Sequence, residues 1–154
     1  MYKTEDELIS ILEELIKNGE NECVEFKCAE NNFDVDKLGK YFSAMSNEAT
    51  LRNRQYSWIV FGVDDKTHEL IDTKYCANNN FNHIKEQIAK NTTDNISFIE
   101  VYPLIIDGKR VIMFQVPAAV GTPINWKGYP YGRTGEGLKP LSQNKIEQIR
   151  NTAI

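Results

Sequence analysis

The sequence predicts an α+β fold with a mixed central sheet and flanking helices, in one domain covering residues 1–154. Three observations support this prediction. Helix and strand patterns follow one another in the order helix, strand, helix, strand, helix, hairpin, helix. The run "SWIVFGV" is almost continuously apolar, which is typical of a central strand covered on both faces. Asp107-Gly108 separates two further strand patterns and is a strong hairpin signal.

The first helix pattern, residues 4–19, begins with a capping box between Thr4 and Glu7 and ends at Gly19. Its leucines and isoleucines recur at helical spacing and form one apolar stripe. An alternating strand pattern follows at residues 22–29. Both elements therefore have a buried face.

The second helix pattern covers residues 33–49, with Asp34 as its N-cap. A polar loop that carries Arg52 and Arg54 then leads to the apolar strand, residues 57–65. This strand ends in two aspartates, which places carboxylates at the edge of the predicted sheet.

The second half of the chain predicts a third helix over residues 81–91 and a hairpin over residues 96–117. The Gly-, Pro- and Tyr-rich segment that follows is expected to contain short strands at 124–126 and 129–133. Residues 141–150 form the last helix pattern, with Ser142 as its cap. The glycines of "GRTGEG" lack the order of a P-loop and are interpreted as turn residues.

Composition excludes several classes of protein. Hydrophobic residues make up 41% of the 154 residues and charged residues 26%, which is typical of a globular domain. No apolar run is long enough for a membrane span, and the N-terminus does not resemble a signal peptide. The three cysteines form no C-x-x-C pair, which favours a reducing, cytoplasmic location. The net charge of −4 argues mildly against a large nucleic-acid footprint.

Three carboxylates are candidate ligands for Mg²⁺ or Mn²⁺: Glu20, Glu25 and Asp65. Glu20 joins the other two only if it lies in the turn after Gly19, because its odd spacing from Glu25 places it on the opposite face of a straight strand. The alternative is structural: Glu20 is solvated, Asp65 caps a turn, and Glu25 pairs with Lys27 or with an arginine.

Glu25-Phe26-Lys27 is an E-x-K element. The period of a strand points Glu25 and Lys27 to the same side. Many metal-dependent nucleases direct such a carboxylate and lysine at one scissile phosphate, where the lysine stabilises developing charge. The pattern also occurs by chance in any charged protein.

A set of basic and aromatic residues could contact nucleic acid, since arginines bind phosphates and tyrosines stack on unpaired bases. The alternative is an ordinary polar loop with aromatic side chains that cover a sheet edge. The set consists of Arg52, Arg54, Tyr56, Lys127, Tyr129, Tyr131 and Arg133.

Four segments, in this order, are similar to a known family. They are "GENECVEFK" with a Glu, four residues and Glu-Phe-Lys, "LGKYFSAMSN" with an S-A-x-x-N helix, "WIVFGVDD" with a strand ending in G-V-D-D, and "YGRTGEGLKPLS" with an R-x-G turn. The chain resembles the Schlafen-type AlbA domain family along nearly its whole length. The resemblance implies a Schlafen AlbA-like α+β fold, and bacterial members of the family are often described as DNA-binding.

Through the catalytic Schlafen proteins, the resemblance implies that this chain is a metal-dependent endoribonuclease that acts on tRNA and rRNA. The three acidic residues would correspond to Glu20, Glu25 and Asp65, with Asp64 as the alternative if the register is displaced by one residue. The chain departs from the family in "SNEATLRNRQYSW", which has no glycine and is longer than the usual turn. Catalytic Schlafens also use a duplicated pair of domains, so a single copy would need a homodimer to build a comparable groove, or would contact a smaller substrate.

We therefore expect a domain that engages nucleic acid, RNA rather than duplex DNA, and no membrane. The leading hypothesis is phosphodiester hydrolysis with Mg²⁺ or Mn²⁺ held by Glu20, Glu25 and Asp65, and with Lys27 stabilising charge. The expected nucleic-acid contacts are Arg52, Arg54, Lys127 and Arg133. The alternative is a non-catalytic DNA- or RNA-binding or transcription-regulatory module with a structural acidic cluster. A protein-interaction domain, which fits the acidic net charge, is a third class.

Overall fold

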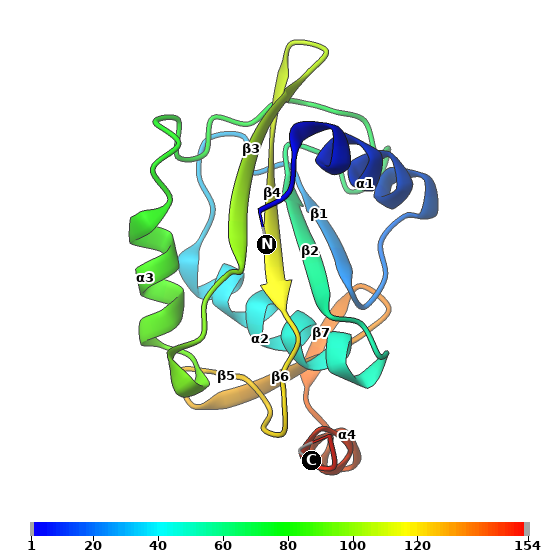
Figure 1. Cartoon of the computed structure of the whole chain (residues 1–154), viewed down its shortest axis with the longest axis vertical. Helices are drawn as coiled ribbons and strands as arrows, with labels where there is room; N and C mark the ends of the chain where they lie inside the picture. Colours follow the sequence, from blue (N-terminus) through cyan, green and yellow to red (C-terminus); the bar gives the residue numbers. More distant parts are fainter. Residues whose placement is uncertain (1, 153–154) are drawn as a thin grey trace.

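A four-stranded mixed sheet forms the centre of the computed structural model, which describes residues 2–152 (Figure 1). Its strands, in the order β1-β2-β4-β3, are β1 (Val24–Lys27), β2 (Tyr56–Phe61), β4 (Lys109–Pro117) and β3 (Glu100–Ile106). β1 runs parallel to β2, whereas β4 is antiparallel to both of its neighbours. The predicted α+β fold with a mixed central sheet is therefore confirmed.

Strand β2 is the central strand that the apolar run predicts. Trp58 and Val60 pack in the core on the side of α1 (Glu5–Asn18), and Ile59 and Phe61 pack on the side of α2 (Val35–Leu51). Each of these four side chains is at most 5% exposed. Helix α2 makes the crossover between the parallel strands β1 and β2, which a parallel pair requires.

The remaining helices pack into the same core cluster as α2. They are α3 (Asn82–Lys90) and α4 (Gln143–Arg150), and a short 3₁₀ helix, η1 (Thr93–Asn95), follows α3. The predicted caps are confirmed, because Asp34 and Ser142 accept hydrogen bonds from the first turns of α2 and α4. Thr4 and Glu7 form the expected capping box at the start of α1. No helix within residues 2–152 combines the length and apolar character of a membrane span.

A second, three-stranded sheet lies against α2 and consists of β5 (Asn125–Trp126), β6 (Tyr129–Thr134) and β7 (Gly137–Pro140). The sequence predicts the first two strands but neither β7 nor their assembly into a sheet. β7 is four residues long and contains a glycine and a proline, which are depleted in strands, so its pattern is weak. Of the glycines of "GRTGEG", Gly135 lies in the turn between β6 and β7 as expected, whereas Gly132 and Gly137 lie within the two strands.

Candidate functional site

Glu25 and Lys27 lie on the face of the sheet that α2 covers. Val24 and Phe26 belong to the core on the α1 side, so the alternation along β1 directs Glu25 and Lys27 the other way. Glu25 is only 2% exposed, while the Lys27 side chain retains 20% of its accessible surface. Glu25 is thus so deeply buried that a charged carboxylate there needs a paired cation or hydrogen bonds.

Two cations surround the Glu25 carboxylate. Arg133 Nη2 donates to Glu25 Oε1 at 3.1 Å, and Lys27 Nζ lies 4.0 Å from Glu25 Oε2. The ring of Tyr41, from α2, is the common neighbour of both cations: Lys27 Nζ is 5.1 Å and Arg133 Cζ 5.6 Å from its centroid. This arrangement joins β1, α2 and β6 through one buried ionic cluster.

Glu20 folds back toward this cluster from the turn that follows α1. Its Oε2 accepts a hydrogen bond from the backbone N–H of Phe26 at 3.2 Å. Burial, together with a hydrogen bond between the Glu20 and Glu25 carboxyl groups, raises the pKa of Glu25 to about 8. Arg133 and Lys27 lower the pKa of Glu25 but do not outweigh these effects. The Glu25 carboxyl group therefore favours its protonated form at neutral pH.

Asp65 is a second acidic neighbour of Lys27. Burial lowers the pKa of Lys27, but Glu25, Tyr41 and Asp65 together raise it above its ordinary value. Asp65 itself is exposed in the loop after β2. Lys27 therefore keeps its charged form beside these acidic neighbours.

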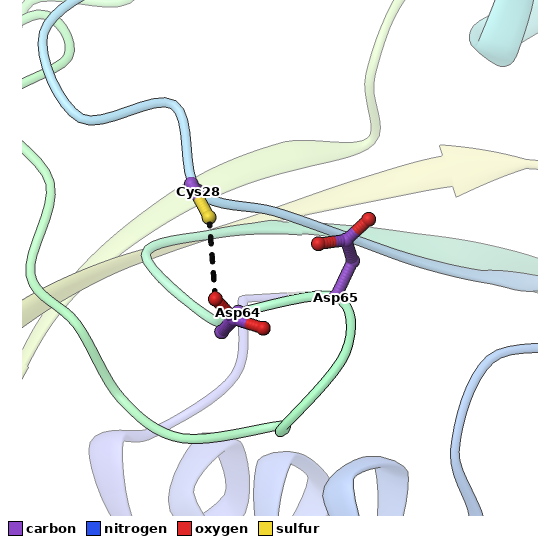
Figure 2. Close-up of side chains that lie close together, drawn as sticks. All are labelled: Cys28, Asp64 and Asp65. Atoms are coloured by element: carbon purple, nitrogen blue, oxygen red, sulfur yellow. Dashed lines mark hydrogen bonds between the residues drawn. The ribbon is translucent and has the colours of Figure 1, made fainter.

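Asp65 also belongs to a second cluster, with Asp64 and Cys28 (Figure 2). One ligand atom from each of these three residues lies within 4.8 Å of the others, and the Cys28 thiol donates to Asp64 Oδ2 at 3.9 Å. Asp64 Oδ1 accepts from the backbone N–H groups of Lys66 and Thr67, at 2.8 and 2.9 Å. Asp64 is therefore the aspartate that caps the turn, and Asp65 is the one near Lys27.

The two clusters differ in their suitability for a divalent cation. Within residues 2–152, three potential ligand atoms lie within 4.8 Å of one another in the group of Cys28, Asp64 and Asp65. Within the same range, Glu20, Glu25 and Asp65 do not form such a group. Mg²⁺ and Mn²⁺ prefer oxygen ligands, and a thiol is a poor partner for them. Glu20 and Glu25 offer the carboxylate oxygens that a hard cation prefers, and the pKa of Glu25 is raised mainly by its burial.

The S-A-x-x-N motif of α2 holds the second sheet in place. Ser43 Oγ donates to the carbonyl of Ile124 at 2.6 Å and accepts from the backbone N–H of Tyr131 at 3.1 Å. Asn47 Nδ2 donates to the carbonyls of Ile124 and Tyr131, while its Oδ1 accepts from the Ile124 N–H at 2.8 Å. Buried polar side chains of α2 thus satisfy backbone groups of the β5–β6 segment.

Glu48, the residue after Asn47 on α2, completes this attachment. It is fully buried, and its Oε2 accepts from the backbone N–H of Arg133 at 3.1 Å and from Lys145 Nζ at 2.6 Å. Arg52 lies 3.5 Å from Glu48 Oε1 and 3.3 Å from Glu22. Glu48 therefore links α2, β6 and α4, and positions the residue that pairs with Glu25.

The four predicted nucleic-acid contacts do not lie together. Arg54 is exposed, and Arg52 is 42% exposed but paired with two carboxylates. Lys127 is 58% exposed and lies 3.3 Å from Asp36, in the first turn of α2, whereas Arg52 follows the last turn. The prediction for Arg133 needs correction: its side chain is 0% exposed, because the β6–β7 hairpin folds against α2 and buries it beside Glu25.

Sequence reasoning missed Tyr41, Glu48 and Lys145. Tyr41 lies in the quoted helix segment and carried only an apolar signal, and Glu48 follows Asn47 directly. A charged residue within the buried face of a helix is the signal that could have identified Glu48, since such residues are almost never buried without a partner. Lys145 lies 97 positions from Glu48 in the sequence and meets it only in the folded chain, so no spacing rule indicates it.

Comparisons with known proteins support the fold. The crystal structure of the DIP2311 protein of Corynebacterium diphtheriae superposes with a TM-score of 0.67 and 19% identity, covering 97% of this chain and 29% of that protein. The solution structure of the N-terminal domain of a putative ATP-dependent DNA helicase RecG-related protein of Nitrosomonas europaea has a TM-score of 0.53 and 19% identity. It covers 87% of this chain and 90% of that domain.

Two sequence comparisons concern the family to which the chain belongs. No curated protein matches the chain. The sequence profile of the family described as Schlafen, AlbA_2 matches residues 20–142, a range that includes Glu20, the α2 motif and the β6–β7 hairpin. The chain therefore belongs to the Schlafen AlbA_2 family.

Proposed function

We propose that this domain binds RNA in preference to duplex DNA and hydrolyses its phosphodiester bonds with Mg²⁺ or Mn²⁺. The observation that carries the proposal is the pair of carboxyl groups, Glu20 and Glu25, directly beside the charged Lys27. Family membership and the likeness to the N-terminal domain of a DNA helicase-related protein support a role with nucleic acid.

Each residue of the cluster has a distinct task in this proposal. Glu20 and Glu25 would hold the cation, whereas Asp65 groups with Asp64 and Cys28 in the loop after β2. A bound Mg²⁺ or Mn²⁺ supplies Lewis-acid charge and an activated water for phosphate chemistry. Lys27 keeps its proton and reaches solvent, so its ammonium group is available to a phosphate oxygen. Arg133 is a positioning residue that orients Glu25.

Cleavage of end-labelled tRNA with Mn²⁺ tests this proposal. We expect the parent protein to cleave and Glu25→Gln to lose at least ~100-fold in rate, in the range that a single electrostatic group contributes to catalysis. Glu86→Gln, which neutralises an exposed glutamate on α3, is the matched control and should cleave like the parent. Intact tRNA with the parent protein, or undiminished cleavage by Glu25→Gln, contradicts the enzymatic proposal.

A second candidate is a non-catalytic nucleic-acid-binding module. It is favoured by the direct contact between Glu25 and Arg133, which is what a structural ion pair would show. Chelator separates the two candidates, because RNA binding by a module survives chelation whereas metal-dependent cleavage stops. Binding measured in chelator, together with no cleavage in Mn²⁺, would establish the module.

A further inference from the structure

Two tyrosines lie side by side on the outer part of β6. The ring centroids of Tyr129 and Tyr131 are 5.6 Å apart with an interplanar angle of 47°, and Tyr129 is 55% exposed. The alternation along β6 places both on the same face as Arg133, which pairs with Glu25. At ~3.4 Å per residue, the pair begins ~7 Å from Arg133 and ends ~14 Å from it.

Two lysines flank the tyrosines. Lys40 Nζ, from α2, lies 6.0 Å from the Tyr131 ring centroid, and Lys127 is in the turn between β5 and β6. Both pair with one carboxylate, Asp36, at 3.4 and 3.3 Å. Their side chains remain 38% and 58% exposed, so two ammonium groups against one carboxylate leave this surface locally positive in an otherwise acidic chain.

The support beneath the tyrosines is rigid. The backbone of Tyr131 is bonded to Ser43 and Asn47, so the strand is fixed on α2. Trp126 packs so closely on Gly39 that a Cβ at position 39 would come within 2.2 Å of its indole. The indole Nε1 also donates to Asp36 Oδ1 at 2.8 Å, which fixes the carboxylate between the lysines. A ligand therefore meets a preorganised surface and orders little of it on binding.

We infer that Tyr129 and Tyr131 are a stacking site for unpaired bases of RNA, whose adjacent phosphates are contacted by Lys40 and Lys127. This inference rests on the proposed function and narrows it to RNA with single-stranded segments next to the reacting phosphate. Unpaired bases present their faces to aromatic side chains, while bases inside a duplex are already stacked on one another. The lysines supply the sequence-independent part of the affinity.

Fluorescence anisotropy with a labelled single-stranded RNA and with a blunt RNA duplex, in chelator, tests the inference. Tyr129→Ala should weaken single-strand binding roughly 5- to 150-fold, which corresponds to one stacked base. Tyr129→Phe keeps the ring and should bind like the parent. Tyr2→Ala removes another exposed tyrosine, 71% exposed beside α1, and should leave binding unchanged. None of the variants should alter duplex binding.

A complementary readout is photocrosslinking of a 5-iodouridine-containing single strand, which should map to Tyr129 or Tyr131. Equal single-strand affinity of Tyr129→Ala and the parent overturns the inference, as does an equal loss for single strand and duplex. If Tyr129→Ala is neutral while the parent still binds or cleaves RNA, the stacking site is wrong and the proposed function stands. A parent protein that binds neither RNA overturns both.

Discussion

The Glu25 side chain is a buried carboxyl group whose pKa is raised although an arginine donates to it. Its pKa is raised to about 8, first by burial and second by the carboxyl group of Glu20, although Arg133 donates to it at 3.1 Å. Arg133 Nε and Nη1 have no hydrogen-bond partner among the described residues, so this guanidinium is only partly satisfied. Strongly shifted pKa values are common at functional sites and also occur in structural ion-pair networks, so the experiments on Glu25 decide between the two.

The pH dependence of stability follows from this pKa. A folded-state pKa of about 8 exceeds the ordinary glutamate value of about 4.3, so the folded state binds the proton more tightly than the unfolded state does. The contribution is fully present below about pH 4.3 and is lost as the pH rises through about 8. We expect the free energy of unfolding in urea to fall over this range, and Glu25→Gln to flatten the slope. Glu86→Gln is the control, and identical slopes for Glu25→Gln and the parent would contradict the raised pKa.

Among the elements, α2 has the largest role in building the site. Ser43, Asn47 and Glu48 lie on its buried face and bond to the backbone of the β5–β6 segment instead of to one another. This contact determines where β6 lies, and thus the positions of Arg133 and of the two tyrosines. The S-A-x-x-N motif is therefore explained as an attachment of the second sheet and not as a direct ligand-binding element.

Substitution of Asn47 tests the attachment. Asn47→Ala leaves the buried N–H and carbonyl of Ile124 with fewer partners, which costs about 1–3 kcal/mol for each unsatisfied group. We expect a loss of stability of at least that size in urea unfolding, and faster hydrogen exchange at the Ile124 amide. Asn144→Ala, on the exposed face of α4, should change stability by less than about 0.5 kcal/mol. Unchanged exchange at Ile124 would show that α2 does not hold β5.

On the scale of the whole molecule, the exposed cations predicted to contact nucleic acid lie far apart. Arg52 and Lys127 lie at opposite ends of α2, which is 17 residues and therefore ~25 Å long. With a net charge of −4, one copy offers few phosphate contacts to a large RNA. A second copy would double the contacts without any change in the fold.

We therefore expect two copies of the chain on each tRNA. Sedimentation-velocity measurements at increasing protein concentration should reach a complex of two proteins and one tRNA, in chelator to prevent cleavage. The protein without RNA gives the reference state. A complex that saturates with one copy contradicts the homodimer, while the proposals for Glu25 and Tyr129 do not depend on it.

Local signals in the sequence predicted the elements well because their causes are local. The Thr4–Glu7 capping box, the Asp34 cap and the Asp107-Gly108 hairpin each depend on residues within a few positions of one another. The alternation in β1 likewise predicted which side chains share a face. The shortness of β7 left no comparable signal, and the boundary of β1 depends on how far β2 pairs with it.

The candidate site divides in the same way. Its chemistry was readable from residue types and order: the acids Glu20, Glu25 and Asp65, and Lys27 two positions after Glu25. Their environment was not, because Arg133 reaches Glu25 across 108 positions and Glu20 depends on how the turn after α1 folds back. Burial decides whether an arginine binds a phosphate or a carboxylate, and burial arises only when α2 and β6 pack together. Residue identity by itself therefore established which groups are available, while long-range packing set their partners, their proton affinity and their exposure.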